Sequence, residues 1–376
     1  MLNRLTYFCL IECGFTGPNP SFMGNMSGLK YLDVSYNFDL ERGQLGEWIG
    51  NLRGLETLGL GGVNLSTTGG PISSRLLSLP HLRNLWLSYN LDLKVNLFSI
   101  VQHSRQLEML DLSWSNVAGV IPPSIGNLST LQSLHLSGNS LTGSILWTLG
   151  VQKLPELDLG SNQLNGSLPS SFGNLSSLVW LDLSNNFLSG IIPPSIEQLS
   201  SLISLSLDHN NFHGTFLLSV LANLTELTQL YLSSNNMLTV KVNGFWIPKF
   251  QLQRLGLRSC NMEGDFPIFI STQYDIEYLE LSNNSLKGDI PNCLWDVTYL
   301  YNLQFLDLSM NLFDRFAPAK IGKNQQPLVF LSLAKNNLHG GIPHSIYEGQ
   351  LEVLDLSNNK LSGKISESIG NFSSTL

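Results

Sequence analysis

The sequence is poor in charge and has no long apolar run, and each shortage excludes a class of protein. Charged residues make up 13% of its 376 residues, against roughly 25% in ordinary soluble domains. Asp and Glu number 28 and Lys and Arg only 20, so the net charge is −8 and binding to a nucleic-acid backbone is not expected. No apolar stretch approaches the roughly 18 residues that a membrane-spanning helix needs.

Cysteine is also scarce. Cys9, Cys13, Cys260 and Cys293 are too few for a disulfide scaffold, and they lack the paired spacing of a zinc site. The seven histidines show no metal-binding spacing either. We therefore expect neither a metal nor a cofactor. The first residues lack the apolar core of about seven residues that a secretory signal needs, so neither a signal peptide nor a membrane anchor is expected in this chain.

Leucine is abundant, with 74 residues, and it is arranged in a repeat. The pattern is L-x-x-L-x-L-x-x-N-x-L-x-G-x-I-P, and residues 178–193 fit it throughout. Its first position recurs fifteen times at spacings of 23 to 27 residues, at Leu5, Leu29, Leu55, Leu82, Leu107, Leu131, Leu154, Leu178, Leu202, Leu227, Leu252, Ile276, Leu303, Leu328 and Leu351. Such a period indicates a solenoid of stacked repeats.

Each repeat position has a physical role. L-x-x-L-x-L places apolar side chains on the inner face of a short strand, and stacked repeats join these strands into a parallel sheet. We therefore predict an α/β leucine-rich-repeat solenoid, a horseshoe or superhelical arc. It has a parallel concave sheet, short flanking strands and short helical turns on the convex side. One domain covers residues 1–376. No end cap is recognisable, so we expect the chain to be truncated at both ends.

The ninth repeat position holds asparagine in most repeats. An inward asparagine supplies both an amide donor and a carbonyl acceptor, and it can pair the backbone groups that the turn leaves without partners. Cys13 and Cys260 replace it twice, and we expect Cys260 to be a buried thiol; Val63 and Ser115 are the other departures. The asparagines are Asn37, Asn90, Asn139, Asn162, Asn186, Asn210, Asn235, Asn284, Asn311, Asn336 and Asn359.

Aromatic residues mark a candidate binding surface. Outward positions of the strands form the concave face, where solenoids bind partners. Rings at this density are typical of binding hot spots, although some could only shield neighbouring strands. The predicted ligand-binding residues are Tyr31, Tyr36, Trp86, Tyr89, Trp114, Trp180, Tyr231, Tyr278, Phe305 and Phe330.

An acidic file accompanies the rings at a single repeat position. It could attract a basic partner, or the carboxylates could only bond neighbouring backbone. Two of them one repeat apart resemble the carboxylate pair of a glycosidase, but every repeat offers the same pair, and we predict no enzyme. The file comprises Asp33, Asp111, Asp158, Asp182, Glu280, Asp307 and Asp355.

Eight N-x-S/T motifs suggest N-glycosylation in the secretory pathway, although G-N-L-S is also repeat consensus. The candidate sites are Asn25, Asn64, Asn127, Asn165, Asn174, Asn223, Asn283 and Asn371.

The L-x-G-x-I-P half of the repeat resembles the plant class of extracellular leucine-rich repeats. A closer likeness lies in residues 238–298, which look like plant receptor-like proteins, the class that includes receptors for fungal xylanase and other immune receptors. The segments that carry it are Trp246-Ile-Pro-Lys-Phe250, Ser259-Cys260 and Ile290-Pro-Asn-Cys-Leu-Trp295, and Val63-Asn-Leu-Ser66 also matches.

The resemblance implies a ligand-recognition ectodomain at the plasma membrane or outside the cell, in defence or development. It would bind a peptide, glycan or pathogen protein on its concave face and signal through a partner receptor kinase. A membrane contact would come only through a segment absent from this chain. The alternative is a secreted inhibitor of a cell-wall-degrading enzyme, similar to plant polygalacturonase inhibitors.

Overall fold

The chain forms two compact units, Met1–Leu188 and Ser189–Leu376, in a computed structural model. The structure describes residues 4–18, 21–41, 48–63, 65, 79–93, 96–145, 153–244, 246–294, 301–315, 327–342 and 351–365. Each unit has strands and buried leucines of its own, and a single solenoid over residues 1–376 stays a prediction.

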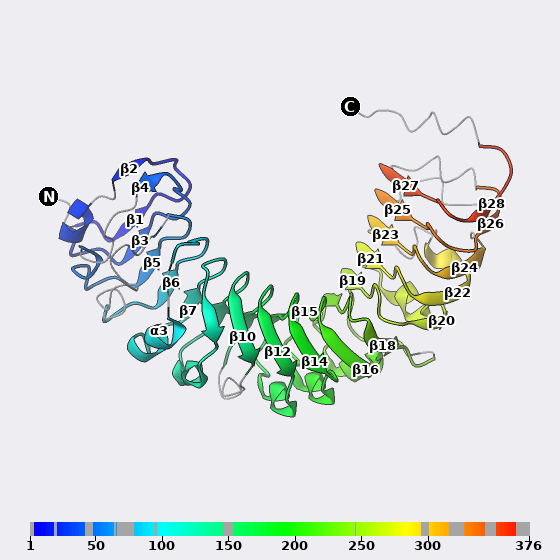
Figure 1. Ribbon diagram of the computed structural model, residues 1–376, viewed down its shortest axis with the longest axis horizontal. Helices are drawn as coiled ribbons and strands as arrows, with labels where there is room; N and C mark the ends of the chain where they lie inside the picture. Colours follow the sequence, from blue (N-terminus) through cyan, green and yellow to red (C-terminus); the bar gives the residue numbers. More distant parts are fainter. Residues whose placement is uncertain are drawn as a thin grey trace. The chain divides into compact units, whose positions relative to one another are not determined.

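The first unit contains one short strand for every predicted repeat. The strands pair in parallel in chain order (Figure 1), and each begins two residues after the first leucine of its repeat. They are β1 (Tyr7–Cys9), β3 (Tyr31–Asp33), β5 (Thr57–Gly59), β6 (Asn84–Trp86), β7 (Met109–Asp111), β9 (Ser133–His135), β11 (Glu156–Asp158) and β13 (Trp180–Asp182).

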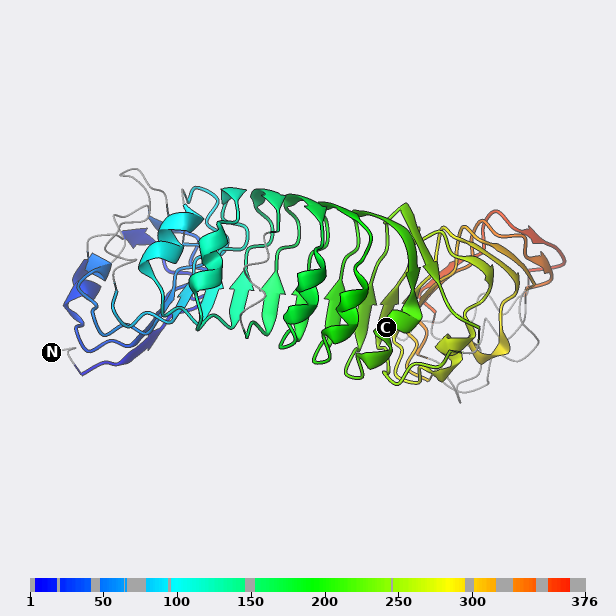
Figure 2. The ribbon, with the colours of Figure 1, turned by 90° about the horizontal axis from the view of Figure 1, so that it is seen from below.

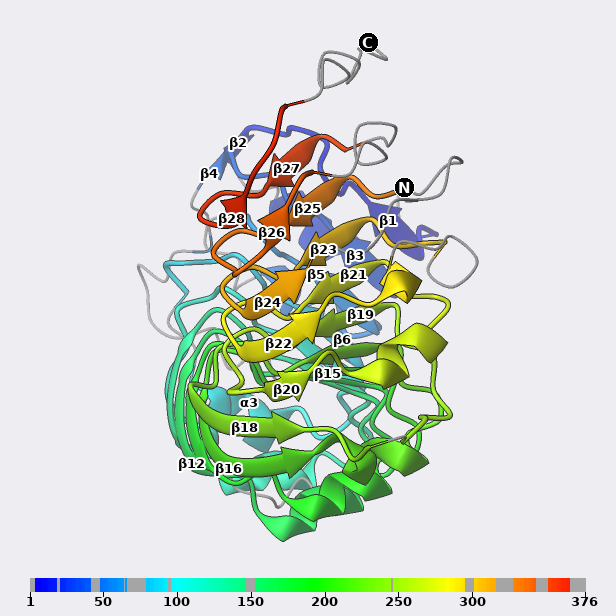
Figure 3. The ribbon, with the colours of Figure 1, turned by 90° about the vertical axis from the view of Figure 1, so that its right-hand side faces the viewer.

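The second unit repeats this arrangement. Figure 3 shows its strands stacked in chain order beside a second row of flanking strands. The stacked strands are β15 (Ser204–Ser206), β17 (Gln229–Tyr231), β19 (Arg254–Gly256), β21 (Tyr278–Glu280), β23 (Phe305–Asp307), β25 (Phe330–Ser332) and β27 (Val353–Asp355). Strands therefore form at all fifteen predicted positions, and the parallel arrangement is confirmed.

Flanking strands follow the L-x-G half of the repeats. In the first unit they are β2 (Gly17–Pro18), β4 (Leu40–Glu41), β8 (Ala118–Val120), β10 (Ser140–Ser144) and β12 (Gln163–Ser167). The boundary between the units falls within the next flanking strand, β14 (Phe187–Gly190). In the second unit they are β16 (Asn211–Leu217), β18 (Met237–Lys241), β20 (Glu263–Asp265), β22 (Ser285–Asp289), β24 (Leu312–Arg315), β26 (His339–Gly340) and β28 (Lys360–Leu361).

Short helices cover the other side of the strands, as Figure 2 shows for α3 in the first unit. Most are short 3-10 turns, and a proline with extended backbone precedes several of them. They are η1 (Ser21–Asn25), α3 (Leu97–His103), η2 (Pro123–Asn127), η4 (Ser170–Asn174), η5 (Pro194–Gln198), η6 (Leu218–Asn223), η7 (Ile268–Thr272) and η8 (Asn292–Leu294). In the described part of the chain, none of the helices has the length and apolar character needed to cross a bilayer.

Leucines fill the space between the strands and the helical turns. Leu178, Leu181 and Leu183 of one repeat are each 0% exposed, and the same three positions are buried in its neighbours. Since each repeat contacts only the next, this burial stabilises the stack one interface at a time. The predicted α/β leucine-rich-repeat fold is confirmed.

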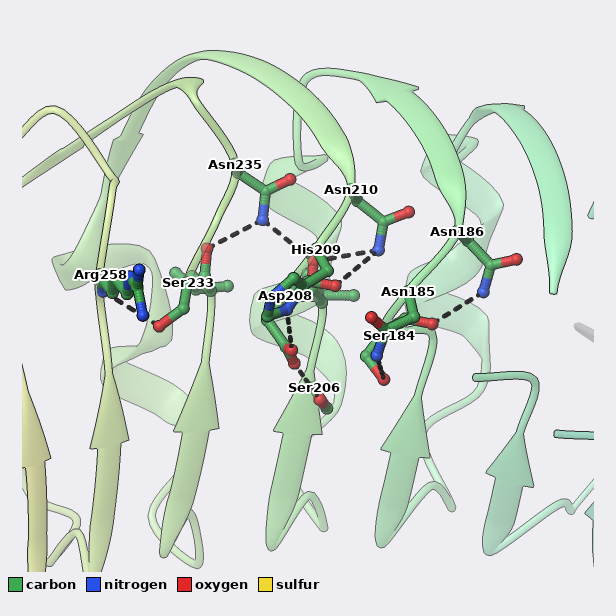
Figure 4. Close-up of polar contacts among 12 residues, drawn as sticks. Ser184, Asn185, Asn186, Ser206, Asp208, His209, Asn210, Ser233, Asn235 and Arg258 are labelled. Carbon is green, nitrogen blue, oxygen red and sulfur yellow. Dashed lines mark hydrogen bonds and ion pairs between the residues drawn. The ribbon is translucent and has the colours of Figure 1, made fainter. Parts of the chain in front are cut away.

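The ninth-position asparagines pair the backbone groups of the turn, as predicted. The Nδ2 group of Asn235 donates to the Leu207 carbonyl of the preceding repeat at 3.0 Å and to the Leu232 carbonyl of its own repeat at 2.8 Å. Its Oδ1 accepts from the Phe212 amide at 3.1 Å. Figure 4 shows Asn210 and Asn235 in this role in the second unit. The asparagine side chains thus replace a backbone ladder where the strands end.

Two replacements at this position keep part of the pattern. Ser115 donates from its Oγ to the Leu87 carbonyl at 2.8 Å, and Cys260 donates from its Sγ to the Leu232 carbonyl at 3.2 Å. Cys260 is 0% exposed, and burial raises the pKa of its thiol to about 12. The prediction of a buried thiol is confirmed. Cys9, Cys13 and Cys260 form no disulfide.

We predict that Asn235→Ala destabilises the second unit by about 3 kcal/mol, because three buried backbone groups lose their partner at once. Hydrogen exchange of the Phe212 amide, which loses its acceptor, should accelerate before that of distant repeats. The matched control is Asn223→Ala, an exposed asparagine at the end of η6, with an expected effect within about 0.5 kcal/mol. Equal effects of the two substitutions would contradict the role of the asparagine side chain.

We also predict that a thiol reagent at neutral to mildly alkaline pH modifies the exposed Cys13 and spares Cys260 in the folded protein. The Cys260 thiol stays protonated there because its pKa is about 12, and the thiolate is the reactive form. Mass spectrometry of the two cysteine-containing peptides gives the result, and labelling in denaturant serves as the control. Modification of Cys260 at the rate of Cys13 in the native protein would show that the packing is wrong.

Candidate ligand-binding surface

We call the side of the strands opposite the helical turns the open face. In the first unit this face carries a cluster of rings. Tyr31 in β3 stacks on Tyr7 in β1, with ring centroids 4.2 Å apart, and meets Trp86 in β6 edge-on at 6.2 Å. Burial and the neighbouring Asp33 raise the pKa of Tyr31. Sequence reasoning missed Tyr7, which is 58% exposed, although it occupies the same repeat position as Tyr31.

A second exposed ring lies further along the same unit. Trp180 is the first residue of β13 and is 47% exposed. Neither this ring nor the cluster at Tyr31 is fully packed by the strands, so both offer apolar area to a ligand.

The open face of the second unit carries a separate ring stack. Tyr278, Phe305 and Phe330 occupy one repeat position on β21, β23 and β25, and their centroids are 4.4 and 4.3 Å apart. Tyr231 leans over Gly256, where a side chain would approach its Cδ1 to 3.1 Å. These rings are half-buried because they cover one another, so part of their area already stabilises the sheet.

Three predicted rings do not lie on strands, which corrects their placement on the outward strand positions. Tyr36, Tyr89 and Trp114 follow their strands by three residues, at the eighth repeat position. Here the backbone is left-handed, with φ of +60°, +59° and +55°, because the chain must turn to aim the next side chain inward. Left-handed backbone costs a bulky residue about 1 kcal/mol or more.

These rings form a continuous row with Phe38, which sequence reasoning also missed. We call Tyr36, Phe38, Tyr89 and Trp114 the aromatic edge. Tyr36 lies 6.1 Å from Phe38 and 6.2 Å from Tyr89, and Tyr89 stacks on Trp114 at 6.3 Å. All four are exposed, Phe38 by 60% and Tyr89 by 50%.

Glycines at the eighth position make room for this row. An ideal Cβ at Gly62 would lie 2.7 Å from Cε1 of Phe38, and one at Gly138 would lie 2.3 Å from Cδ2 of Trp114. Phe38 and Trp114 therefore lie directly over the backbone of the following repeat. Along the eighth position the order is therefore Tyr36, Gly62, Tyr89, Trp114 and Gly138, and the glycines provide space for the neighbouring rings.

Most carboxylates of the acidic file accept hydrogen bonds from nearby backbone amides. In six repeats an aspartate Oδ1 accepts from the amide two residues later, at 2.8 to 3.0 Å; these residues are Asp33, Asp111, Asp158, Asp182, Asp307 and Asp355. Asp33 is only 2% exposed and fits because Gly59 beside it lacks a side chain. Attraction of a basic partner by this file stays a prediction.

Glu280 differs from the rest of the file. It accepts from Oγ of Ser233 at 3.1 Å and lies 4.0 Å from Arg258, in a position where burial raises the pKa of its carboxyl group. Desolvation thus outweighs the two partners that favour the charged form.

A polar group that sequence reasoning missed lies on the same unit (Figure 4). Asp208 accepts from Oγ of Ser206 at 2.6 Å and pairs with Nδ1 of His209 at 2.8 Å. Its outward seventh position in the repeat was the signal that could have found it. Among the described residues, no three His, Cys, Asp or Glu side chains converge as metal ligands.

Six of the predicted glycosylation sites lie in the described residues, and all six asparagines are exposed. Asn25, Asn127, Asn174 and Asn223 each end a 3-10 turn, whereas Asn165 lies in β12 and Asn283 in a turn after β21. Asn64 and Asn371 fall outside the described residues. Glycosylation itself stays a prediction.

Models of the leucine-rich repeat match the chain at residues 152–212 and again at residues 106–128, 130–151, 275–297 and 350–372. Receptor-like protein 41 of Arabidopsis thaliana is 32% identical over 369 residues, 92% of this chain and 41% of that protein. Receptor-like protein 39 of the same plant is 32% identical, with 98% of this chain and 43% of that protein covered. The chain thus spans less than half the length of these curated relatives.

Solved structures of plant receptor ectodomains have the same fold. The ectodomain of the Arabidopsis receptor kinase HAESA, in complex with an IDA peptide hormone, is 28% identical with a TM-score of 0.72. The match covers 95% of this chain and 62% of that one. The Arabidopsis thaliana GASSHO1/SCHENGEN3 ectodomain, in complex with CASPARIAN STRIP INTEGRITY FACTOR 2, is 29% identical with a TM-score of 0.71. That match covers 98% of this chain and 49% of that one. The chain is therefore a leucine-rich-repeat protein that is similar, over nearly its whole length, to plant receptor-like proteins.

Proposed function

We propose that the chain is part of the ligand-recognition ectodomain of a plant cell-surface receptor-like protein. It binds a peptide, glycan or protein on the open face of its strands and signals through a partner receptor kinase. The exposed rings on this face carry the proposal. Trp180 on β13 is a tryptophan on a strand of this face that remains 47% exposed, and large exposed rings are typical of binding surfaces.

The similar proteins support a binding role. The HAESA and GASSHO1/SCHENGEN3 ectodomains are each solved with a ligand, and HAESA is also solved with the co-receptor SERK1. A partner kinase for this chain is proposed on that likeness. Enzymatic activity is not part of the proposal, because the carboxylates that could form a catalytic pair, such as Asp158 and Asp182, already accept backbone hydrogen bonds.

Exposed N-x-S/T motifs support an extracellular location. Four of them end helical turns on the side of the sheet opposite the open face, so glycans there would leave that face free. The open face therefore remains the surface available to a ligand.

We predict that alanine at Trp86 and Trp180 in the first unit, or at Phe305 in the second, weakens ligand binding. Loss of a hot-spot ring costs about 2 kcal/mol, or roughly thirtyfold in affinity. The measurement is quantitative capture from apoplastic fluid and microbial culture filtrate on immobilised protein, followed by titration of the captured compound. Phe98→Ala on α3, a ring 48% exposed on the other side, and Tyr274→Ala beyond η7, 46% exposed, are the matched controls.

We expect the wild type and both controls to retain the ligand and the open-face variants to lose it. Equal retention by all variants would disprove binding on this face. Capture of a cell-wall-degrading enzyme that the chain then inhibits would favour the inhibitor function instead.

A further inference from the structure

We propose that the aromatic edge of the first unit binds an extended peptide that carries arginine or lysine at alternate positions. The edge is distinct from the open face of the strands, because its rings lie past the strand ends. The inference rests on the proposed recognition function and adds a second surface with its own ligand chemistry.

The backbone conformation of these rings is unfavourable for bulky residues. The eighth repeat position is left-handed in every described repeat, and elsewhere in the first unit it holds Glu12, Gly62, Gly138, Ser161 and Asn185, none of which is aromatic. Tyr36, Tyr89 and Trp114 are bulky residues with φ of +55° to +60°, and they remain 36%, 50% and 45% exposed. Neither backbone preference nor burial accounts for rings at these positions. Strain kept at an exposed site is typical of function.

The spacing of the rings matches that of side chains on one face of an extended peptide. Tyr36 and Tyr89 are 6.2 Å apart, and Tyr89 and Trp114 are 6.3 Å apart. In an extended peptide, side chains on one face repeat every second residue, or about 6.6 Å. Side chains i, i+2 and i+4 of such a peptide therefore match the three rings in turn.

Acidic residues accompany the rings in the sequence. Glu12 occupies the eighth position in the first repeat, Asp39 follows Phe38, and Asp92 comes three residues after Tyr89. All three are exposed. In the described part of the unit, the basic residues instead precede the strands, at the opposite edge of the sheet; they are Arg4, Lys30, Arg53, Arg83, Arg105 and Lys153.

Two of those basic residues are already paired. Lys30 contacts Glu56 at 2.8 Å, and Arg83 contacts Glu108. Among the described residues of this unit, those that follow the strands near the rings include exposed acidic residues, whereas the basic residues precede the strands. A cation over an aromatic face within about 6 Å is attracted by the ring, and nearby carboxylates add to the attraction. Arginine and lysine side chains satisfy both conditions.

The test uses a fluorescent peptide of alternating arginine and threonine, about eight residues long, so that several arginines can reach the row. Its control is an isomer with the same composition and all arginines in one block. We expect the alternating peptide to bind about fivefold tighter than the isomer in anisotropy titrations at about 0.15 M salt. Trp114→Ala should weaken it about tenfold.

Matched variants separate the edge from its surroundings. Phe98→Ala removes a ring of the same unit with almost the same exposure, 48% against 45%, on α3 at the other side of the strands, and should leave peptide affinity unchanged. Tyr89→Asn keeps a residue that tolerates left-handed backbone, so affinity should fall while the unfolding midpoint is maintained. Asp92→Asn should weaken binding and flatten its dependence on salt.

Equal affinity for the two peptides, or equal effects of Trp114→Ala and Phe98→Ala, would overturn the inference. If the edge fails this test while the open-face variants still lose a captured ligand, the proposed function stands and only the edge proposal is wrong. If neither surface responds, both are wrong.

Discussion

The structure depends on one hydrogen-bonding constraint, which is the pairing of backbone groups where each strand ends. The asparagine at the ninth position meets it by reaching both its own repeat and the preceding one, as Asn235 does toward Leu232 and Leu207. Because the side chain must point inward immediately after a strand, the residue before it is forced into left-handed backbone. The stacked strands, the turn and the exit into the flanking strand all follow from this single bond pattern.

That constraint also separates two kinds of surface. Residues on the strands have ordinary extended backbone, so rings there can be kept by packing alone, as the stack of Tyr278, Phe305 and Phe330 shows. Residues at the eighth position are limited by backbone strain, and glycine or asparagine satisfies it at least cost. A tryptophan at that position, as at Trp114, needs a different explanation, and an exposed ring gains little from burial. Binding is the explanation that the ring spacing and the neighbouring charges support.

Sequence alone predicted the repeat register and the strands, because leucines that recur at this spacing are typical of stacked repeats and of few other structures. It predicted the asparagine ladder for the same reason, and the thiol of Cys260 followed from the ladder. It placed Tyr36, Tyr89 and Trp114 on the strands wrongly, because the pattern shows that these positions point outward without showing where the strand ends. It missed Phe38, whose place over Gly62 depends on the absence of a side chain one repeat away. Contacts between outward side chains depend on rotamers and neighbours that no periodicity encodes.

The aspartates illustrate how the same residue type can be structural or available. In Asp111 and Asp158 one carboxylate oxygen accepts a hydrogen bond from the backbone amide two residues later. This bond fixes the carboxylate and leaves fewer acceptor sites for a ligand. Glu280 has an additional methylene group, reaches across to Ser233 instead, and is buried enough for its carboxyl pKa to rise. The carboxylates beside the aromatic edge lie outside this file, after the turn. Since Asp39 and Asp92 are exposed and close in sequence to these rings, and Glu12 is exposed at the same repeat position as three of them, they support the proposed attraction of a cationic ligand to the edge.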